Sequence, residues 1–311
     1  MAPVVHLCSV SKSFRGGPSV LDGLELNVNR GEVFGLIGRN GSGKTTALRI
    51  LMGLLRADHG TARVLGRDMW EADRRHRQRV AYVSQSQQLP DWLPIHELAR
   101  SSSLLYDSWD QPFLTEILRR WNLRADQPIS RLSGGNQRLA AIALALATRP
   151  EVLVLDEPAA GLDPIARRDL NQCLIEVLGE GTGCTIVLST HLLADLERLA
   201  TRVGIIEEGR LVAEGAVEEW QRTMRRIQIV FSQEHPPRDF SIPGAIRSRT
   251  LGPVVSALAR IEDESQLDAI RAMDGARIYV FPLTLEELFV DWFQGSTTLG
   301  NLGPDPDRHH G

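Results

Sequence analysis

The chain has 311 residues, a length that suggests about two domains of ordinary size. Hydrophobic residues make up 42% of it, a share typical of globular proteins, which argues against intrinsic disorder. The 35 Lys and Arg residues against 39 Asp and Glu residues give a net charge of −4. Composition therefore gives no electrostatic reason to expect a nucleic-acid partner.

The sequence indicates neither secretion nor membrane insertion. Its three cysteines are an odd number without metal-ligand spacing, which indicates reduced thiols in a cytosolic protein. The first residues lack the basic and apolar segments of a signal peptide. The densest apolar segment, 139–147, has nine residues. A bilayer span needs about 20, so we expect that this chain does not cross a membrane by itself.

Short apolar runs alternate with helix-like segments through the first two-thirds of the chain. Several runs are apolar throughout, as expected of strands that are covered on both faces. This alternation predicts an α/β fold with a largely parallel sheet. The expected strands are 4–10, 32–37, 80–85, 151–158 and 185–191, and the expected helices are 46–55, 137–147, 167–178 and 192–200.

Two stretches depart from this pattern. The residues after about 87 contain half of the six tryptophans and no convincing strand, so we expect a helical insertion over about 87–150. Beyond the first domain, 1–220, two runs alternate with period two around a helix-like segment. They predict a small C-terminal α+β domain over 221–294. The Gly- and Pro-rich tail, 295–311, is expected to be disordered.

A glycine-rich segment, 38–45, has the pattern G-x-x-x-x-G-K-[ST] between an apolar strand and a helical pattern. Glycines let successive backbone N–H groups turn toward an anion, and the following helix presents the positive end of its dipole there. We expect Lys44 to reach the β- and γ-phosphates of a nucleotide and Thr45 to offer its hydroxyl to Mg²⁺. The residues expected to hold the nucleotide in this segment are Gly38, Asn40, Gly41, Ser42, Gly43, Lys44, Thr45 and Thr46.

Two carboxylates, Asp156 and Glu157, end the apolar run 152–155. Open α/β sheets bind ligands at the carboxyl edge of their strands, and adjacent strand residues point to opposite sides. Asp156 is therefore the expected partner of the Mg²⁺ ion held by Thr45. Glu157 is the candidate general base for a water that attacks the γ-phosphate.

The segment L-S-G-G-N-Q at 132–137, followed by the Asp156-Glu157 strand, resembles the signature of ATP-binding cassette (ABC) ATPases. Other motifs of that family follow in the expected order: Gln85 ends a strand as the Q-loop glutamine does, Asp163 lies in a D-loop-like G-L-D, and His191 matches the switch histidine. The resemblance covers about 4–215 and implies a P-loop NTPase fold of the ABC type that hydrolyses ATP with Mg²⁺. It implies catalytic roles for Gln85 and His191, Gln85 as a further magnesium ligand, and a nucleotide contact for Asp163.

In this family the nucleotide held by one subunit is covered by the signature of a second. The resemblance therefore implies that Ser133, Gly134 and Gly135 complete the site of a partner subunit, in a homodimer or in a heterodimer with a related chain. The sequence is consistent with this, because Ser-Gly-Gly before an apolar helix presents N–H groups and a helix N-terminus to an anion.

Two positions depart from the family pattern. The adenine-stacking residue is usually tyrosine, and the candidate here is Phe14, which keeps the aromatic face and loses the hydroxyl. The signature carries Asn136, a variant seen in some sugar-importer ATPases, although those usually have two cassettes in one chain and this chain has one.

Three segments, 106–110, 191–197 and 284–289, resemble ATPase subunits of bacterial antibiotic and drug exporters. The predicted function is accordingly the ATPase subunit of an exporter that powers a separate transmembrane permease from the inner face of the membrane. An importer ATPase and a soluble ABC ATPase remain alternatives. Soluble members that act on ribosomes usually carry two cassettes, and DNA-repair members insert a long coiled coil between phosphate loop and signature. Here Lys44 and Ser133 are 89 residues apart.

Three surface features have two interpretations each. Residues 86–100 would form a dock for the permease through Leu89, Trp92, Leu93 and Ile95, which we expect to be exposed, or these residues would fill the core of the insertion. The apolar stripe within 285–293 would pack on its own domain or form a contact with another subunit. The basic run 74–79 is interpreted as a solvated helix face.

Overall fold

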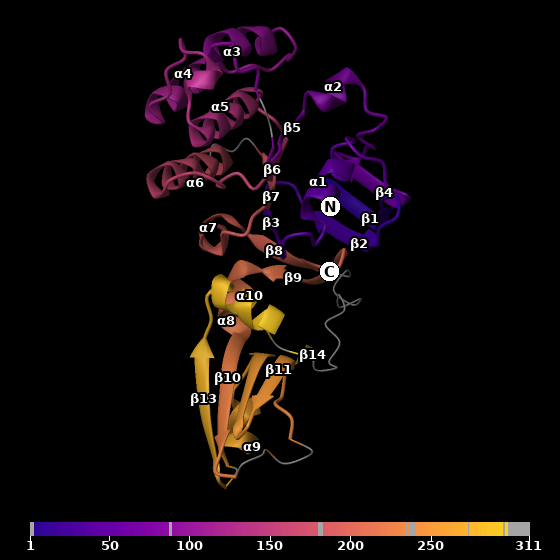
Figure 1. The fold of residues 1–311 in the computed structure, drawn as a ribbon, viewed down its shortest axis with the longest axis vertical. Helices are drawn as coiled ribbons and strands as arrows, with labels where there is room; N and C mark the ends of the chain where they lie inside the picture. Colours follow the sequence, from indigo (N-terminus) through magenta and orange to yellow (C-terminus); the bar gives the residue numbers. More distant parts are fainter. Residues whose placement is uncertain are drawn as a thin grey trace. The chain divides into compact units, whose positions relative to one another are not determined.

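The computed structural model describes residues 3–86, 89–179, 183–233, 236, 240–272, 274–294 and 296–297. The chain forms two compact units, Met1–Val212 and Ala213–Gly311, each of which is described by itself (Figure 1).

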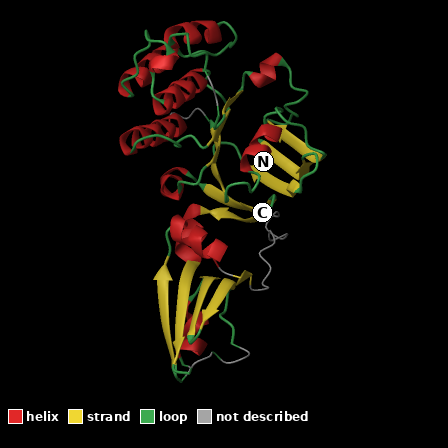
Figure 2. Ribbon diagram, in the orientation of Figure 1, coloured by secondary structure: helices red, strands yellow, loops and turns green. Residues whose placement is uncertain are grey.

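The first unit is built on a six-stranded sheet whose strands alternate with helices along the chain (Figure 2). The strands, in sheet order, are β5 (Val80–Val83), β6 (Val152–Asp156), β7 (Thr185–Ser189), β3 (Val33–Ile37), β8 (Arg202–Glu207) and β9 (Arg210–Ala216). Neighbouring strands from β5 to β8 pair in parallel. Every residue of β3, β6 and β7 is buried, which explains their unbroken apolar runs. The predicted parallel sheet is confirmed.

The expected strand 4–10 lies outside this sheet. It is part of β1 (Val5–Ser13), which pairs antiparallel with β2 (Ser19–Val28) and β4 (His59–Val64) in a separate three-stranded sheet. Helix α1 (Lys44–Leu51) packs in one hydrophobic cluster with residues of both sheets. Figure 1 shows α1 on one side of the parallel sheet, with α6 (Pro164–Gly179) and α7 (Leu193–Leu199) on the other.

Residues between β5 and β6 form a helical insertion, as the sequence predicts. Its elements are α3 (Ile95–Ser103), α4 (Gln111–Arg120), the short η1 (Ile129–Arg131) and α5 (Gly134–Ala147). Trp92 is 72% exposed, whereas Ile95 is fully buried. The expectation that Ile95 is exposed is wrong, because this residue begins α3 and packs inside the insertion. The basic run forms α2 (Arg74–Arg77), whose arginines are exposed and whose His76 is buried.

The second unit is an antiparallel sheet with helices. Its strands, in sheet order, are β13 (Ala276–Pro282), β10 (Met224–Phe231), β12 (Val254–Arg260), β11 (Ala245–Leu251) and β14 (Ser296–Thr297). Its helices are α8 (Val217–Thr223), η2 (Glu264–Leu267), α9 (Asp268–Arg271) and α10 (Leu285–Gln294).

Helix α10 packs on its own unit. Its residues Leu285, Leu288 and Trp292 are buried, and Arg226 of β10 donates to both carboxylate oxygens of Asp291 at 2.6 and 3.0 Å. Of the tail expected to be disordered, only Ser296–Thr297 lie within the described residues, as β14, and the rest lies outside them.

Candidate active site

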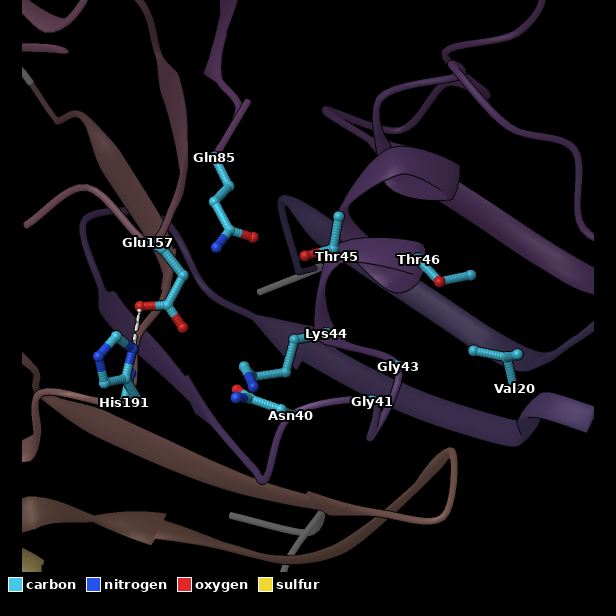
Figure 3. Close-up of a pocket in the computed structure, with 10 residues that line it drawn as sticks. All are labelled: Val20, Asn40, Gly41, Gly43, Lys44, Thr45, Thr46, Gln85, Glu157 and His191. Carbon is cyan, nitrogen blue, oxygen red and sulfur yellow. Dashed lines mark hydrogen bonds and ion pairs between the residues drawn. The ribbon is translucent and has the colours of Figure 1, made fainter. Parts of the chain in front are cut away.

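A cavity of about 440 Å³ opens at the carboxyl edge of the parallel sheet, where β3, β5, β6 and β7 end (Figure 3). It brings together residues that are far apart in the sequence. The residues that line it are Val20, Asn40, Gly41, Gly43, Lys44, Thr45, Thr46, Gln85, Glu157 and His191.

The glycine loop between β3 and α1 shapes one wall of this cavity. Gly41 and Gly43 have φ angles of 82° and 107°, which side-chain-bearing residues rarely adopt. A Cβ on Gly43 would also lie 2.8 Å from the carbonyl oxygen of Val20. Both positions therefore require glycine. Gly38 and Ser42 belong to the same loop but do not line the cavity, and a Cβ on Gly38 would collide with Ser42 Oγ.

Lys44 begins α1 and is 7% exposed. Its Nζ donates to the carbonyl oxygens of Gly38 at 2.7 Å and Arg39 at 3.2 Å. Burial lowers the pKa of Lys44, while the nearby carboxylates Glu157 and Asp156 act in the opposite direction. The buried ammonium lines the cavity and, among the described residues, is hydrogen-bonded only to neutral carbonyls, so a bound phosphate would supply the negative charge that pairs with it.

Asp156 lies beneath the cavity and is almost fully buried. Its Oδ1 accepts hydrogen bonds from Thr45 Oγ1 at 3.2 Å and from Ser189 Oγ at 2.5 Å. Its Oδ2 is buried and has no hydrogen-bond partner among the described residues. An unsatisfied buried carboxylate oxygen beside a threonine hydroxyl fits a hard cation such as Mg²⁺. Within the described part of the chain no three His, Cys, Asp or Glu side chains form a metal cage, so phosphate oxygens and water would complete such a site.

Glu157 has a left-handed backbone with φ 51°, a conformation that costs free energy in a residue with a side chain. Its N–H donates to the carbonyl oxygen and the hydroxyl of Ser189 at 3.0 and 3.1 Å. The carboxylate is nearly buried, and Oε2 lies 2.7 Å from Nδ1 of His191. Gln85 follows β5 and faces Glu157 and Thr45 across the cavity (Figure 3).

Besides Gly38, Ser42 and Asp156, five predicted site residues lie outside the lining of this cavity: Phe14, Ser133, Gly134, Gly135 and Asp163. The exposed Ser133 accepts a hydrogen bond from the backbone N–H of Asn136 and so caps α5. The carboxylate of Asp163 accepts the N–H groups of Ile165 and Ala166 at the start of α6. Phe14 follows β1 and is 48% exposed, with Lys12 Nζ 5.8 Å from its ring centroid.

Sequence reasoning missed three residues of the site: Val20, which lines the cavity, Ser189 and Arg138. Ser189 holds both Asp156 and the backbone of Glu157, and its only sequence signal is its place two residues before His191. Arg138 of α5 donates to the carbonyl oxygens of Gln85 and Glu157, and no pattern in the sequence indicates contacts to backbone carbonyls.

A strand, a glycine loop and a helix that begins with a buried lysine, together with a carboxylate-ended neighbouring strand, define a nucleoside-triphosphate site of the P-loop class. The family model described as ABC transporter matches residues 21–160. The Nod factor export ATP-binding protein I of Paraburkholderia xenovorans is 42% identical over 68% of this chain and 70% of that protein. The chain belongs to the ATP-binding proteins of the ABC transporter family and is an ATPase.

Two further comparisons agree. The ABC transporter ATP-binding protein YtrB of Bacillus subtilis is 28% identical over 94% of this chain and 99% of its own length. A dimeric ATP-binding cassette solved in a post-hydrolysis state with ADP and Pi aligns with a TM-score of 0.61 at 25% identity, over 68% of this chain and 98% of that one. None of the helices in the described ranges combines the length and hydropathy of a bilayer span.

Proposed function

We propose that this ATPase powers an exporter. The support is the similarity to ATP-binding proteins whose names state export, together with the resemblance of the segments 106–110, 191–197 and 284–289 to antibiotic and drug exporters. One of these relatives, from Burkholderia thailandensis, is 36% identical over 87% of this chain and 91% of its own length. That alignment is too long for the cassette alone, so it extends into the second unit.

The observation that carries the proposed chemistry is the convergence of Lys44, Glu157 and His191 on one cavity. The glycine loop and Lys44 bind the phosphates of ATP. Thr45, Asp156 and Gln85 would hold Mg²⁺, which would neutralise charge at the β- and γ-phosphates. Glu157 accepts the proton of the attacking water, and His191 holds the Glu157 carboxylate and contacts the γ-phosphate.

The signature residues act on a second copy. Ser133, Gly134 and Gly135 do not line the cavity of their own chain, yet Ser133 and Gly134 are exposed at the N-terminus of α5, where N–H groups face outward. A helix end of this kind suits a γ-phosphate presented by another subunit. We infer a dimer that encloses two ATP molecules, and the dimeric cassette among the similar structures supports this arrangement.

The permease is a separate chain with membrane-spanning segments, and this ATPase works at the inner face of the membrane through it. We infer that the dock is the segment 86–100, of which Ser86 and 89–100 are described by the structure and which ends within α3. Trp92 projects from it with 72% of its surface exposed, as a side chain awaiting an apolar partner would.

Direction of transport is tested in the source cell without knowing the substrate. Cells that lack this chain are complemented with the parent or with Glu157→Gln, and small molecules in cell extract and medium are compared. An exporter predicts compounds that accumulate inside and disappear from the medium in the Glu157→Gln cells. Depletion inside the cells would instead favour an importer, and unchanged pools together with ribosome or DNA association would favour a soluble ATPase.

A further inference from the structure

One guanidinium joins two segments of the ATP site. Arg138 lies in the second turn of α5, five residues after Ser133. Its Nη1 donates to the carbonyl oxygen of Glu157 at 3.0 Å, and its Nη2 donates to the carbonyl oxygen of Gln85 at 2.6 Å. These two residues lie 72 positions apart in the chain and follow two neighbouring strands, β5 and β6.

The contacts are of a kind that only arginine makes well. Its planar guanidinium presents several N–H groups in a fixed fork, so two acceptors are held at a set separation. Arg138 is partly buried, and burial lowers its pKa, while the charges of Asp156 and Glu157 act in the opposite direction. The cation is therefore kept close to the site carboxylates rather than in open solvent.

Arg138 completes the support of the Glu157 backbone. Glu157 has φ 51°, and its N–H is already held by Ser189. The carbonyl of the same residue accepts Arg138 Nη1 at 3.0 Å and the backbone N–H of Ala160 at 3.1 Å, so the peptide groups on both sides of the Glu157 Cα are fixed. Because the direction of a side chain follows from its backbone, this support decides where the carboxylate points.

We propose that Arg138 is a positioning residue for hydrolysis: it fixes the backbone of Glu157 and, through the same guanidinium, makes that position depend on Gln85. The inference rests on the proposed role of Glu157 as general base. A displacement of the segment after Gln85 moves the Gln85 carbonyl. Because the same guanidinium donates to the Glu157 carbonyl, this movement also displaces the Glu157 backbone. The helix that carries the guanidinium also carries the signature at its N-terminus, so one side chain of the signature helix contacts the Gln85 and Glu157 segments.

The test compares Arg138→Met with Arg120→Met. The control is matched, because Arg120 also links two helices of the first unit, through Glu176, and neither residue lines the ATP cavity. For Arg138→Met we expect kcat to fall about tenfold to a hundredfold, with the KM for ATP within about threefold of the parent, since misplacement of a reacting group reduces the chemical step and spares binding. Arg120→Met retains the parent kcat.

Two readouts separate positioning from a general loss of structure. Millimolar guanidinium restores part of the rate of Arg138→Ala and none of any loss in Arg120→Ala. Amide hydrogen exchange in a peptide that contains Gln85 and Ser86 becomes faster in Arg138→Met and stays at the parent rate in Arg120→Met. If Arg138→Met does not fold, Arg138→Lys replaces it, and we expect a several-fold fall in kcat because one ammonium serves both carbonyls poorly.

The inference is overturned by a parent-like kcat in folded Arg138→Met, or in Arg138→Lys when that variant replaces it. It is also overturned by a loss confined to KM, or by equal losses in the Arg120 control. The proposed function fails in a different way: the parent chain then shows no ATP hydrolysis that depends on Glu157. The parent and Glu157→Gln are therefore measured first.

Discussion

The imidazole Nδ1 of His191 lies 2.7 Å from Oε2 of Glu157, and the backbone N–H of His191 donates to the same oxygen at 3.3 Å. One residue at the end of β7 thus holds the carboxylate that follows β6. The other carboxylate oxygen points away from His191 (Figure 3). In the proposed mechanism, a water that approaches the γ-phosphate would meet the second oxygen of a carboxylate whose first oxygen His191 already holds, an arrangement that suits a general base.

The first prediction concerns this carboxylate. Glu157→Gln keeps the size of the side chain but cannot accept the proton, so kcat should fall about 10² to 10⁴-fold while ATP binding is retained. Phosphate release measures the rate, and a fluorescent ATP analogue measures binding. The control is Glu176→Gln, an exposed carboxylate on α6 that pairs with Arg120. Hydrolysis at the parent rate in Glu157→Gln would remove Glu157 from the role of base.

Sequence patterns predicted the parts of this site that lie on apolar strands. The apolar runs that form β3, β6 and β7 are buried on both faces, which marks them as strands of a parallel sheet. The sequence alone therefore predicts that Lys44, Asp156, Glu157 and His191 lie at the carboxyl edge of that sheet. Strand β2 was missed because its burial alternates irregularly and its pairing with β1 shifts register three times. Arg138 was missed for another reason. Its acceptors are backbone carbonyls, which every residue carries, so the types of residue in the sequence do not indicate the contact.

The second prediction concerns Phe14. Phe14 lies in the turn between β1 and β2, and Val20 on β2 lines the cavity, so we propose that the Phe14 ring stacks on the adenine of the bound nucleotide. Stacking of a base on an aromatic side chain is worth about 1–3 kcal/mol. Phe14→Ala should therefore weaken ATP binding roughly 5- to 150-fold, and Phe14→Tyr should bind like the parent. Calorimetry with ATP measures the change.

Inorganic triphosphate is the matched probe for this prediction, because it fills the phosphate site and has no base. Its affinity should be the same in Phe14→Ala and in the parent. An equal loss for triphosphate and ATP would mean that the substitution disturbs the glycine loop, and an unchanged affinity for ATP would mean that the adenine lies elsewhere.

The third prediction concerns the dimer. Lys44→Ala disables the phosphate loop of its own chain, and Ser133→Arg places a bulky cation where the partner's γ-phosphate would lie. Each variant alone should be inactive. A mixed dimer contains one site made from the intact loop of one chain and the intact signature of the other, so mixing should restore hydrolysis. Two inactive chains that stay inactive when mixed, although sedimentation shows them paired, would contradict a site shared in this way.

The last prediction concerns the proposed dock, which is hydrogen-bonded to the residues that precede the signature. The carbonyl oxygens of Asp91 and Leu93 accept the backbone N–H groups of Ser130 and Ile129 at 2.8 and 3.0 Å. The segment that follows Gln85 is therefore hydrogen-bonded to η1, which ends two residues before Ser133. A permease helix that displaces Trp92 would move η1, which leads into the signature, and also Gln85. Docking and nucleotide state should accordingly depend on each other.

Single cysteines at the exposed Asp91 and His96, in a Cys8→Ser background, test this dependence. Cys173 and Cys184 are buried, so they do not compete for a crosslinker. Both engineered thiols should crosslink to the co-expressed permease, with yields that differ between ATP and ADP, because the hydrogen bonds to η1 make the dock follow the nucleotide site. Arg63→Cys, on the exposed face of β4, is the control and should give no crosslink. If Asp91→Cys and His96→Cys fail to crosslink while the two proteins still co-purify, the permease binds another surface. If the crosslinks form with equal yield in ATP and ADP, the segment is the dock but its contact with the permease does not depend on the nucleotide.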